Sequence, residues 1–135
     1  MKRDFGRGEG LVPDIPKTSR LIWQDTQHRR LFEILELLRQ PETSRQALDQ
    51  LKSYIDSHFA LEEEYMRRLD YSDYESHTRA HRQFQKEIEE LCRYSESDSE
   101  DFLATASTFL TEWLTRHVMG VDKELEAAIL ASDLR

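Results

Sequence analysis

The stretch from His58 to His81 constrains the fold more than any other part of the chain. In its first half, His58 and Glu62 are four residues apart. In its second half, His77 and His81 have the same spacing. Side chains at positions i and i+4 share one face of a helix, so each pair of metal-capable groups points in one direction. The connection around Asp70 is so short that the two helices must be antiparallel, which brings the pairs to one level and predicts half of a metal site.

Apolar residues recur at intervals of three and four along four long segments, which is the period of a helix with one buried face. These helices are expected over 19–39, from behind Thr43 to 69, over 72–94 and over 99–119, with a short final helix over 121–131. The spacing of Thr43 and Gln46 is typical of a capping box. The inward face of the fourth helix is expected at Phe102, Ala106, Leu110 (or Phe109), Trp113 and His117. The pattern predicts an all-α fold, an antiparallel up-down-up-down four-helix bundle.

The first 18 residues have neither a helical nor an alternating period, and their glycines and prolines are typical of irregular structure. We therefore divide the chain into an N-terminal arm, 1–18, and a bundle domain, 19–135. The composition leaves two possibilities open for the arm. Either it lies along the bundle through its apolar residues, or it forms a mobile tail. The apolar residues are Phe5, Leu11, Val12 and Ile15.

Composition excludes several classes of protein. A chain of 135 residues suits a single domain, and its net charge of −8 without a basic cluster argues against nucleic-acid binding. The sequence has no apolar run long enough to enter a membrane, and its basic start lacks the apolar segment of a signal peptide, so we expect a cytoplasmic monomer. Cys92 is the single cysteine, which excludes an internal disulfide and a cysteine-based zinc site. It is expected to be a half-buried apolar residue.

All five histidines fall on the predicted inward faces of the helices, together with Glu62. A single histidine on such a face is usually a hydrogen-bonded core residue. However, a buried polar group without a partner costs about 1–3 kcal/mol, and the total stability of a small domain is only about 5–15 kcal/mol. Six such groups therefore need a shared partner, and a metal centre would provide it. The histidines are His28, His58, His77, His81 and His117.

The acidic residues beside Glu62 are expected to have a different role. Glu63 and Glu64 lie four residues before Arg67 and Arg68. This is the favourable spacing for ion pairs on the exposed face of a helix. We therefore expect both glutamates at the surface.

Two aspartates could contribute to the site. Asp25 is expected either to pair with Arg29 or to stand behind a metal ligand, where a carboxylate that accepts a hydrogen bond from His28 would fix the tautomer of the imidazole. Asp122 lies just beyond Gly120, five residues after the last histidine. Spacing alone leaves open whether Asp122 caps the final helix or returns to the metal centre where the chain unwinds at Gly120.

Four motifs combine these residues: Gln27-His28, HFxxEE over 58–63, HxxxHxxF over 77–84 and WLxxHxxxxD over 113–122. Together they resemble the hemerythrin family, in particular the bacterial hemerythrins, over about residues 20–125. Two features depart from the family pattern. Ser72 stands where bacterial relatives commonly have a proline, and the first tryptophan, Trp23, lies inside the first predicted helix rather than upstream of it.

The resemblance implies a centre of two iron ions with an oxo or hydroxo bridge, and dioxygen as its ligand. It assigns His77, His81 and His117 to one iron and His28 and His58 to the other, with Glu62 and Asp122 bridging them. The iron with two histidines would keep an open position for dioxygen. The apolar residues implied around that position are Leu31, Phe59, Trp113, Leu114 and Val118. They would exclude water and protons, which slows oxidation of the irons.

We therefore expect a non-haem di-iron protein that binds dioxygen reversibly, for transport, storage or delivery to an oxidase, and that is not an enzyme. Two Fe(II), two carboxylates and one hydroxide sum to about +1, whereas di-iron oxidases use mostly carboxylate ligands. Two alternatives remain: an oxygen- or redox-sensing module with a signalling partner, or a di-iron enzyme that acts on peroxide or NO.

Overall fold

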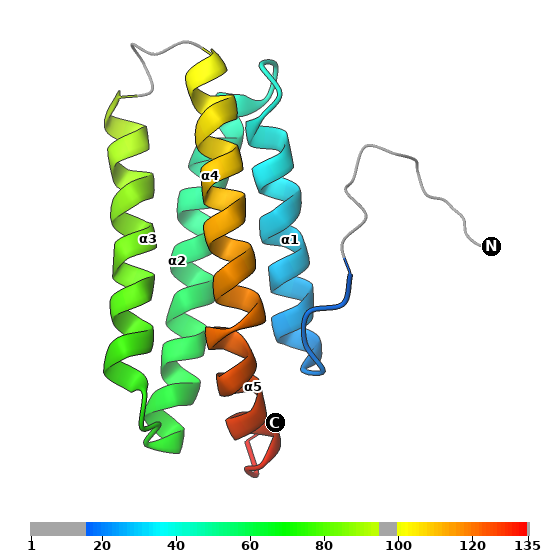
Figure 1. The fold of residues 1–135 in the computed structure, drawn as a ribbon, viewed down its shortest axis with the longest axis vertical. Helices are drawn as coiled ribbons and strands as arrows, with labels where there is room; N and C mark the ends of the chain where they lie inside the picture. Colours follow the sequence, from blue (N-terminus) through cyan, green and yellow to red (C-terminus); the bar gives the residue numbers. More distant parts are fainter. Residues whose placement is uncertain (1–15, 95–99, 135) are drawn as a thin grey trace, which may run out of the picture.

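The computed structural model describes residues 16–94 and 100–134, which form a bundle of antiparallel helices (Figure 1). The helices are α1 (Ile22–Leu38), α2 (Ser44–Leu69), α3 (Tyr74–Tyr94), α4 (Glu100–Met119) and α5 (Val121–Leu130). Successive long helices run in opposite directions, and α5 continues the chain beyond the end of α4. The predicted all-α, up-down-up-down architecture with a short C-terminal helix is confirmed. Most of the predicted arm, 1–15, and the connection over 95–99 lie outside the described residues.

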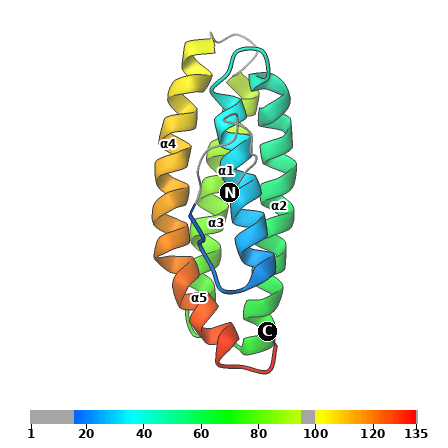
Figure 2. The same cartoon turned by 90° about the vertical axis from the view of Figure 1, so that its right-hand side faces the viewer.

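The segment before α1 is ordered by hydrogen bonds rather than by helix formation. The Ser19 hydroxyl accepts a hydrogen bond from the backbone N–H of Leu21 at 3.0 Å, and α1 begins at Ile22, three residues later than predicted. The backbone N–H of Arg20 donates to Glu126 of α5 at 2.9 Å. Figure 2 shows this segment, in dark blue, running downward and turning back into α1. Residues 18–21 thereby join α1 to α5.

The capping box predicted at Thr43 is wrong. Thr43 precedes α2 but its side chain makes no capping hydrogen bond to that helix. Its hydroxyl donates instead to the carbonyl of Leu37 at 2.7 Å. The last carbonyls of a helix need partners as much as the first N–H groups do. The threonine therefore closes the end of α1 rather than the start of α2.

The predicted break at Gly120 is confirmed, and it separates α4 from α5. Gly120 has φ −119° and ψ −78°, so its backbone is not left-handed. A β-carbon at this position would lie 3.1 Å from the carbonyl oxygen of Arg116, which is tighter than ordinary contacts. The chain turns here and restarts as a helix, with the N–H groups of Lys123 and Glu124 donating to the Gly120 carbonyl. This change of direction turns Asp122 into the bundle.

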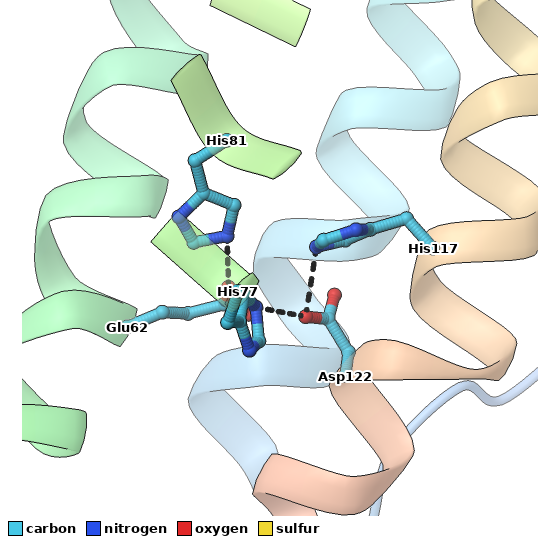
Figure 3. A group of neighbouring side chains, drawn as sticks. All are labelled: Glu62, His77, His81, His117 and Asp122. Atoms are coloured by element: carbon cyan, nitrogen blue, oxygen red, sulfur yellow. Dashed lines mark hydrogen bonds and ion pairs between the residues drawn. The ribbon is translucent and has the colours of Figure 1, made fainter. Parts of the chain in front are cut away.

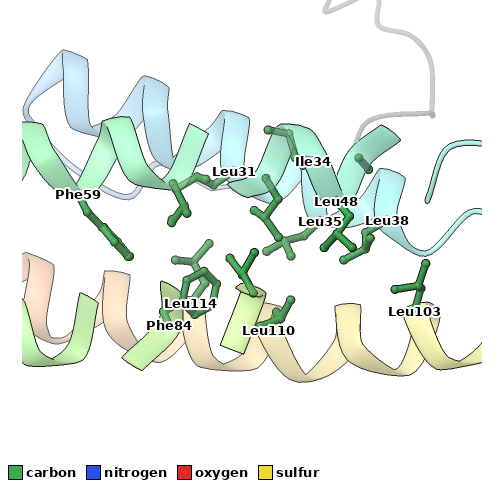
Figure 4. Packing of buried hydrophobic residues seen from close by; sticks show 14 of the residues in the cluster. Leu31, Ile34, Leu35, Leu38, Leu48, Phe59, Phe84, Leu103, Leu110 and Leu114 are labelled. Atoms are coloured by element: carbon green, nitrogen blue, oxygen red, sulfur yellow. The ribbon is translucent and has the colours of Figure 1, made fainter. Parts of the chain in front are cut away.

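The core consists of two apolar clusters on either side of a polar layer. The larger cluster occupies the end of the bundle that contains the α1–α2 turn, where α1 and α2 meet α3 and α4 (Figure 4). The smaller one joins Leu21, Met66, Leu125 and Ile129 at the other end. Because the metal-capable residues lie between the two clusters, the layer is closed to solvent from both ends.

Phe102 and Cys92 are two further residues whose burial the sequence predicts. Phe102 was expected inward but is 39% exposed, and the next residue, Leu103, is buried instead. With Leu110 buried, a residue seven positions earlier shares its face, whereas Phe102 is turned away by about 100°. Cys92 is half-buried, as predicted. None of the described helices has the length and apolarity that crossing a membrane requires.

Candidate metal centre

The structure brings all seven candidate ligands together in the polar layer. They come from all five helices: His28 from α1, His58 and Glu62 from α2, His77 and His81 from α3, His117 from α4 and Asp122 from α5. All are buried. Their ligand atoms form two groups, in each of which the atoms lie within 4.8 Å of one another. One group has three histidines and the other has two, and both groups contain Glu62 and Asp122.

Glu62 presents one carboxylate oxygen to each group. Its Oε1 lies 3.1 Å from Nε2 of His81 and 3.5 Å from Nε2 of His77. Its Oε2 lies 3.2 Å from Nε2 of His58 and 3.8 Å from Nε2 of His28. This is the arrangement of a carboxylate that bridges two cations.

Asp122 is divided between the groups in the same way. Its Oδ1 lies 3.1 Å from Nε2 of His77 and 3.2 Å from Nε2 of His117, and its Oδ2 lies 3.1 Å from Nε2 of His28. Figure 3 shows the carboxylate between the rings of His77 and His117, with His81 directed at Glu62. The structure therefore supports the second reading of Asp122, in which the chain returns to the site after Gly120.

Several of these atoms are fully buried and have these ion-pair contacts but no hydrogen bond among the described residues. They are Nε2 of His28, His77 and His117 and both carboxylate oxygens of Asp122. A buried polar atom without a hydrogen bond costs about 1–3 kcal/mol, and here protonation of the histidines or a bound cation would offset that cost. Imidazole nitrogens and carboxylate oxygens that converge in two groups are what a pair of first-row transition-metal ions requires. The residues present thus fit a two-metal site.

The electrostatics of the seven residues show what a cation would replace. Burial lowers the pKa of His28, but the facing carboxylates of Asp122 and Glu62 outweigh it and raise that pKa to about 9. The same causes raise the pKa of His77 to about 9. Burial raises the pKa of Glu62, yet His58 and the other facing histidines hold it well below its usual range. Without metal, imidazolium–carboxylate pairs stabilise the layer, and metal binding would displace their protons.

Comparison with known proteins agrees with this geometry. The family model described as the Hemerythrin HHE cation binding domain matches residues 22–129. The chain belongs to the hemerythrin family. The resemblance found in the motifs, over about residues 20–125, is confirmed.

Individual hemerythrins match most of the chain. The bacteriohemerythrin of Stenotrophomonas maltophilia is 34% identical over 119 residues, which cover 76% of this chain and 77% of the relative. The myohemerythrin of Theromyzon tessulatum is 32% identical over 98 residues, with 73% and 76% covered. The hemerythrin-like protein of Naegleria gruberi is 25% identical over 103 residues, with 76% and 80% covered.

In this hemerythrin, three of the five histidines are oriented by hydrogen bonds to Nδ1. Gln27 Oε1 lies 2.7 Å from Nδ1 of His58, and Glu63 Oε2 lies 2.8 Å from Nδ1 of His81. Since these oxygens only accept hydrogen bonds, each imidazole carries its proton on Nδ1. The lone pair of Nε2 is then directed into the layer, which is the tautomer a metal ligand needs.

The prediction that Glu63 lies at the surface is wrong. Glu63 is only 7% exposed, and its carboxylate accepts hydrogen bonds from His81 and from Arg82 of α3. Burial raises its pKa, but the hydrogen bond with His81 and the charge of Arg82 outweigh this and lower it. Arg67 pairs with Glu64 instead, whose exposed position was correctly predicted. Spacing along α2 could not reveal that the neighbouring helix α3 supplies the positively charged partner, Arg82.

His28 is oriented through Thr18, a residue of the predicted arm. Asp25 accepts hydrogen bonds from the backbone N–H of Thr18 at 2.7 Å and from its hydroxyl at 3.1 Å. The same hydroxyl lies 2.9 Å from Nδ1 of His28. The expected contact of Asp25 with Arg29 is present at 3.5 Å. Nδ1 of His28 does not bond directly to the Asp25 carboxylate, because the Thr18 hydroxyl stands between the two groups.

The apolar residues predicted around the dioxygen position lie against the histidines. The ring of Phe59 stacks on His81 with centroids 3.7 Å apart, and the ring of Trp113 stacks on His117 at 4.8 Å. Leu31, Leu114 and Val118 are buried in the cluster that adjoins the layer. Figure 4 shows Phe59, Leu31 and Leu114 at the end of this cluster. That these side chains line a dioxygen site stays a prediction.

Proposed function

We propose that this hemerythrin binds two iron ions in the polar layer and that the iron pair binds dioxygen reversibly. One observation carries the proposal: the ligand atoms form two unequal groups that share both carboxylates. His77, His81 and His117 would hold one iron, His28 and His58 the other. Glu62 and Asp122 would bridge them. The family model, which describes a cation-binding domain, supports the same reading.

The inequality of the two groups suggests where a small molecule would bind. The group of His28 and His58 offers one histidine fewer than the other. A metal ion there would keep a position free of protein ligands. The iron pair, when bound, would supply the electrons that hold dioxygen at that position.

The protein's own contribution is to keep water and protons away from this position. The layer lies between two apolar clusters, and the rings of Phe59 and Trp113 cover two of the histidines. Exclusion of water slows the loss of reduced oxygen species and the accompanying oxidation of the irons. The five neutral imidazoles and two carboxylates of the site favour oxygen binding over the high-valent chemistry of carboxylate-rich oxidases. We therefore propose transport, storage or delivery of oxygen rather than catalysis.

The proposal is tested on protein loaded anaerobically with two equivalents of Fe(II) and then exposed to air. We expect two irons per chain and a visible charge-transfer band that appears with oxygen and fades under argon. Glu62→Gln should abolish loading of the iron pair, whereas Glu64→Gln, a change of the same kind at the surface, should leave it intact. Failure of the unaltered chain to hold two irons would refute the site. Fast irreversible oxidation, or turnover with peroxide or NO, would refute reversible binding in favour of sensing or catalysis.

A further inference from the structure

Gln24 is a buried polar residue of α1 that is not among the seven candidate ligands. It is 0% exposed and lies one turn before His28. Its Nε2 donates a hydrogen bond of 3.0 Å to Oε2 of Glu62, the carboxylate shared by the two ligand groups. An apolar residue at an inward position would pack the helix without requiring hydrogen-bond partners. Gln24 therefore acts on the site rather than on the apolar packing.

The orientation of the Gln24 amide is fixed from the side opposite Glu62. The backbone N–H of Leu21 donates to the Ser19 hydroxyl at 3.0 Å, and that hydroxyl donates to Oε1 of Gln24 at 2.7 Å. A backbone N–H can only donate, so the single proton of the hydroxyl is available for the amide oxygen. The NH₂ group must then face Glu62. The reversed amide would place its oxygen against the carboxylate, with no proton between them.

The hydrogen bond reaches only one of the two ligand groups. Oε2 of Glu62 lies on the side of His58, at 3.2 Å, and of His28, at 3.8 Å. This is the group with two histidines, whereas Oε1 faces the other group. A hydrogen bond donated to an anionic ligand withdraws electron density from it and weakens its donation to the metal. The more highly charged, oxidised metal loses more stabilisation by this than the reduced one.

We propose that Gln24, locked by Ser19, is a positioning residue that lowers the donor strength of Glu62 toward the metal of the two-histidine group and thereby stabilises the reduced iron pair. This inference rests on the proposed di-iron centre. The amide oxygen of Gln24 is bonded to Ser19 and its NH₂ group to Glu62, so its effect is exerted through the Glu62 carboxylate. The segment that precedes α1 thus takes part in tuning the site.

The test is a spectroelectrochemical titration of the iron-loaded protein without oxygen. In Gln24→Leu we expect the ratio of oxidised to reduced centre at a fixed potential to rise about tenfold, which corresponds to a potential lower by about 59 mV for one electron. Ser19→Ala removes the hydrogen bond that orients the Gln24 amide without changing a residue of the polar layer. It should shift the potential in the same direction as Gln24→Leu, but by a smaller amount. Gln83→Leu, the same change at an exposed position of α3, should leave the potential unchanged.

Metal content distinguishes the possible failures. Iron is counted in every sample before the titration. If Gln24→Leu holds two irons and has the potential of the unaltered protein, the inference is wrong. If Gln24→Leu loses iron, the test is the potential of iron-loaded Ser19→Ala. A potential equal to that of the unaltered protein then overturns the inference. If the unaltered protein itself does not hold an iron pair, the proposed function fails, and the inference fails with it.

Discussion

Replacement of Glu63 by alanine should weaken metal binding although Glu63 is not itself expected to bind the metal. Its carboxylate accepts the hydrogen bond from Nδ1 of His81 at 2.8 Å. Without it, the imidazole loses the partner that holds its proton on Nδ1 and its Nε2 lone pair toward the layer. The His81 ring is fully buried, so water cannot easily replace the lost acceptor.

The magnitude follows from what each partner of Glu63 loses. An unsatisfied buried donor on His81 costs about 1–3 kcal/mol. The pair with Arg82 adds little, because the guanidinium side chain is 55% exposed and pairs of this kind contribute about 0–1 kcal/mol. We therefore expect the metal-free protein to lose about 2 kcal/mol, or about 5–10 °C in Tm. Loss of such an outer partner lowers metal affinity about 10–100-fold, which corresponds to about 1.4–2.8 kcal/mol.

The assay is a competition titration of Zn²⁺ or Fe(II) against a chelator, with Glu63→Ala compared with Glu64→Ala. Glu64 is the neighbour on the same helix and pairs only with the exposed arginines Arg67 and Arg68 in the described contacts. Glu63→Gln keeps an acceptor oxygen but removes the charge, so we expect it to retain much of the affinity. Equal affinities of Glu63→Ala and Glu64→Ala would refute the argument that the hydrogen bond to His81 prepares the ligand.

Three further predictions concern the stability of the metal-free protein and the protons released when it binds metal. The folded-state pKa values of His28 and His77, about 9, lie above the ordinary 6.5, so the two protonated histidines stabilise the folded state fully below pH 6.5 and lose this effect as pH rises to about 9. Thermal unfolding of metal-free protein should therefore show a Tm that falls over this pH range. A Tm that does not change with pH would contradict the prediction. Metal loading at pH 7 should release about two protons, measured by calorimetry in buffers of different ionisation enthalpy. In denaturant unfolding, Leu51→Ala in the core should cost about 2–5 kcal/mol, whereas Phe109→Ala at the surface should cost less than about 0.5 kcal/mol.

The parts of the molecule that depend on periodicity along one helix could be predicted from the sequence. The four long helices, the break at Gly120 and the burial of all five histidines follow from spacings of three and four. Asp122 is the boundary case, since its return to the site depends on how the chain turns after Gly120. Spacing left that geometry open, and the family resemblance supplied it.

The hydrogen bonds that orient the candidate ligands could not be predicted, because each joins two segments whose contact no sequence pattern indicates. Thr18 belongs to a stretch without any period, yet its hydroxyl connects His28 to Asp25. Gln24 lies on the inward face of α1. A glutamine among the apolar residues and the histidine of that face was the one sign in the sequence that it acts on the site. No comparable signal marks Thr18, since its role depends on how the segment before α1 folds back.

Gln27 and Glu63, two of the residues that orient the ligands, share a geometric relation, which explains why each lies beside a ligand in the sequence. Gln27 precedes a ligand of α1 and bonds to His58 of α2, and Glu63 follows a ligand of α2 and bonds to His81 of α3. Neighbours along a helix differ in direction by about 100°, so when one points at the centre of the bundle, the next points at an adjacent helix. Sliding of either helix pair by one turn, about 5.4 Å, would break these bonds. The register of these helices and the tautomers of His58 and His81 are therefore fixed by the same contacts.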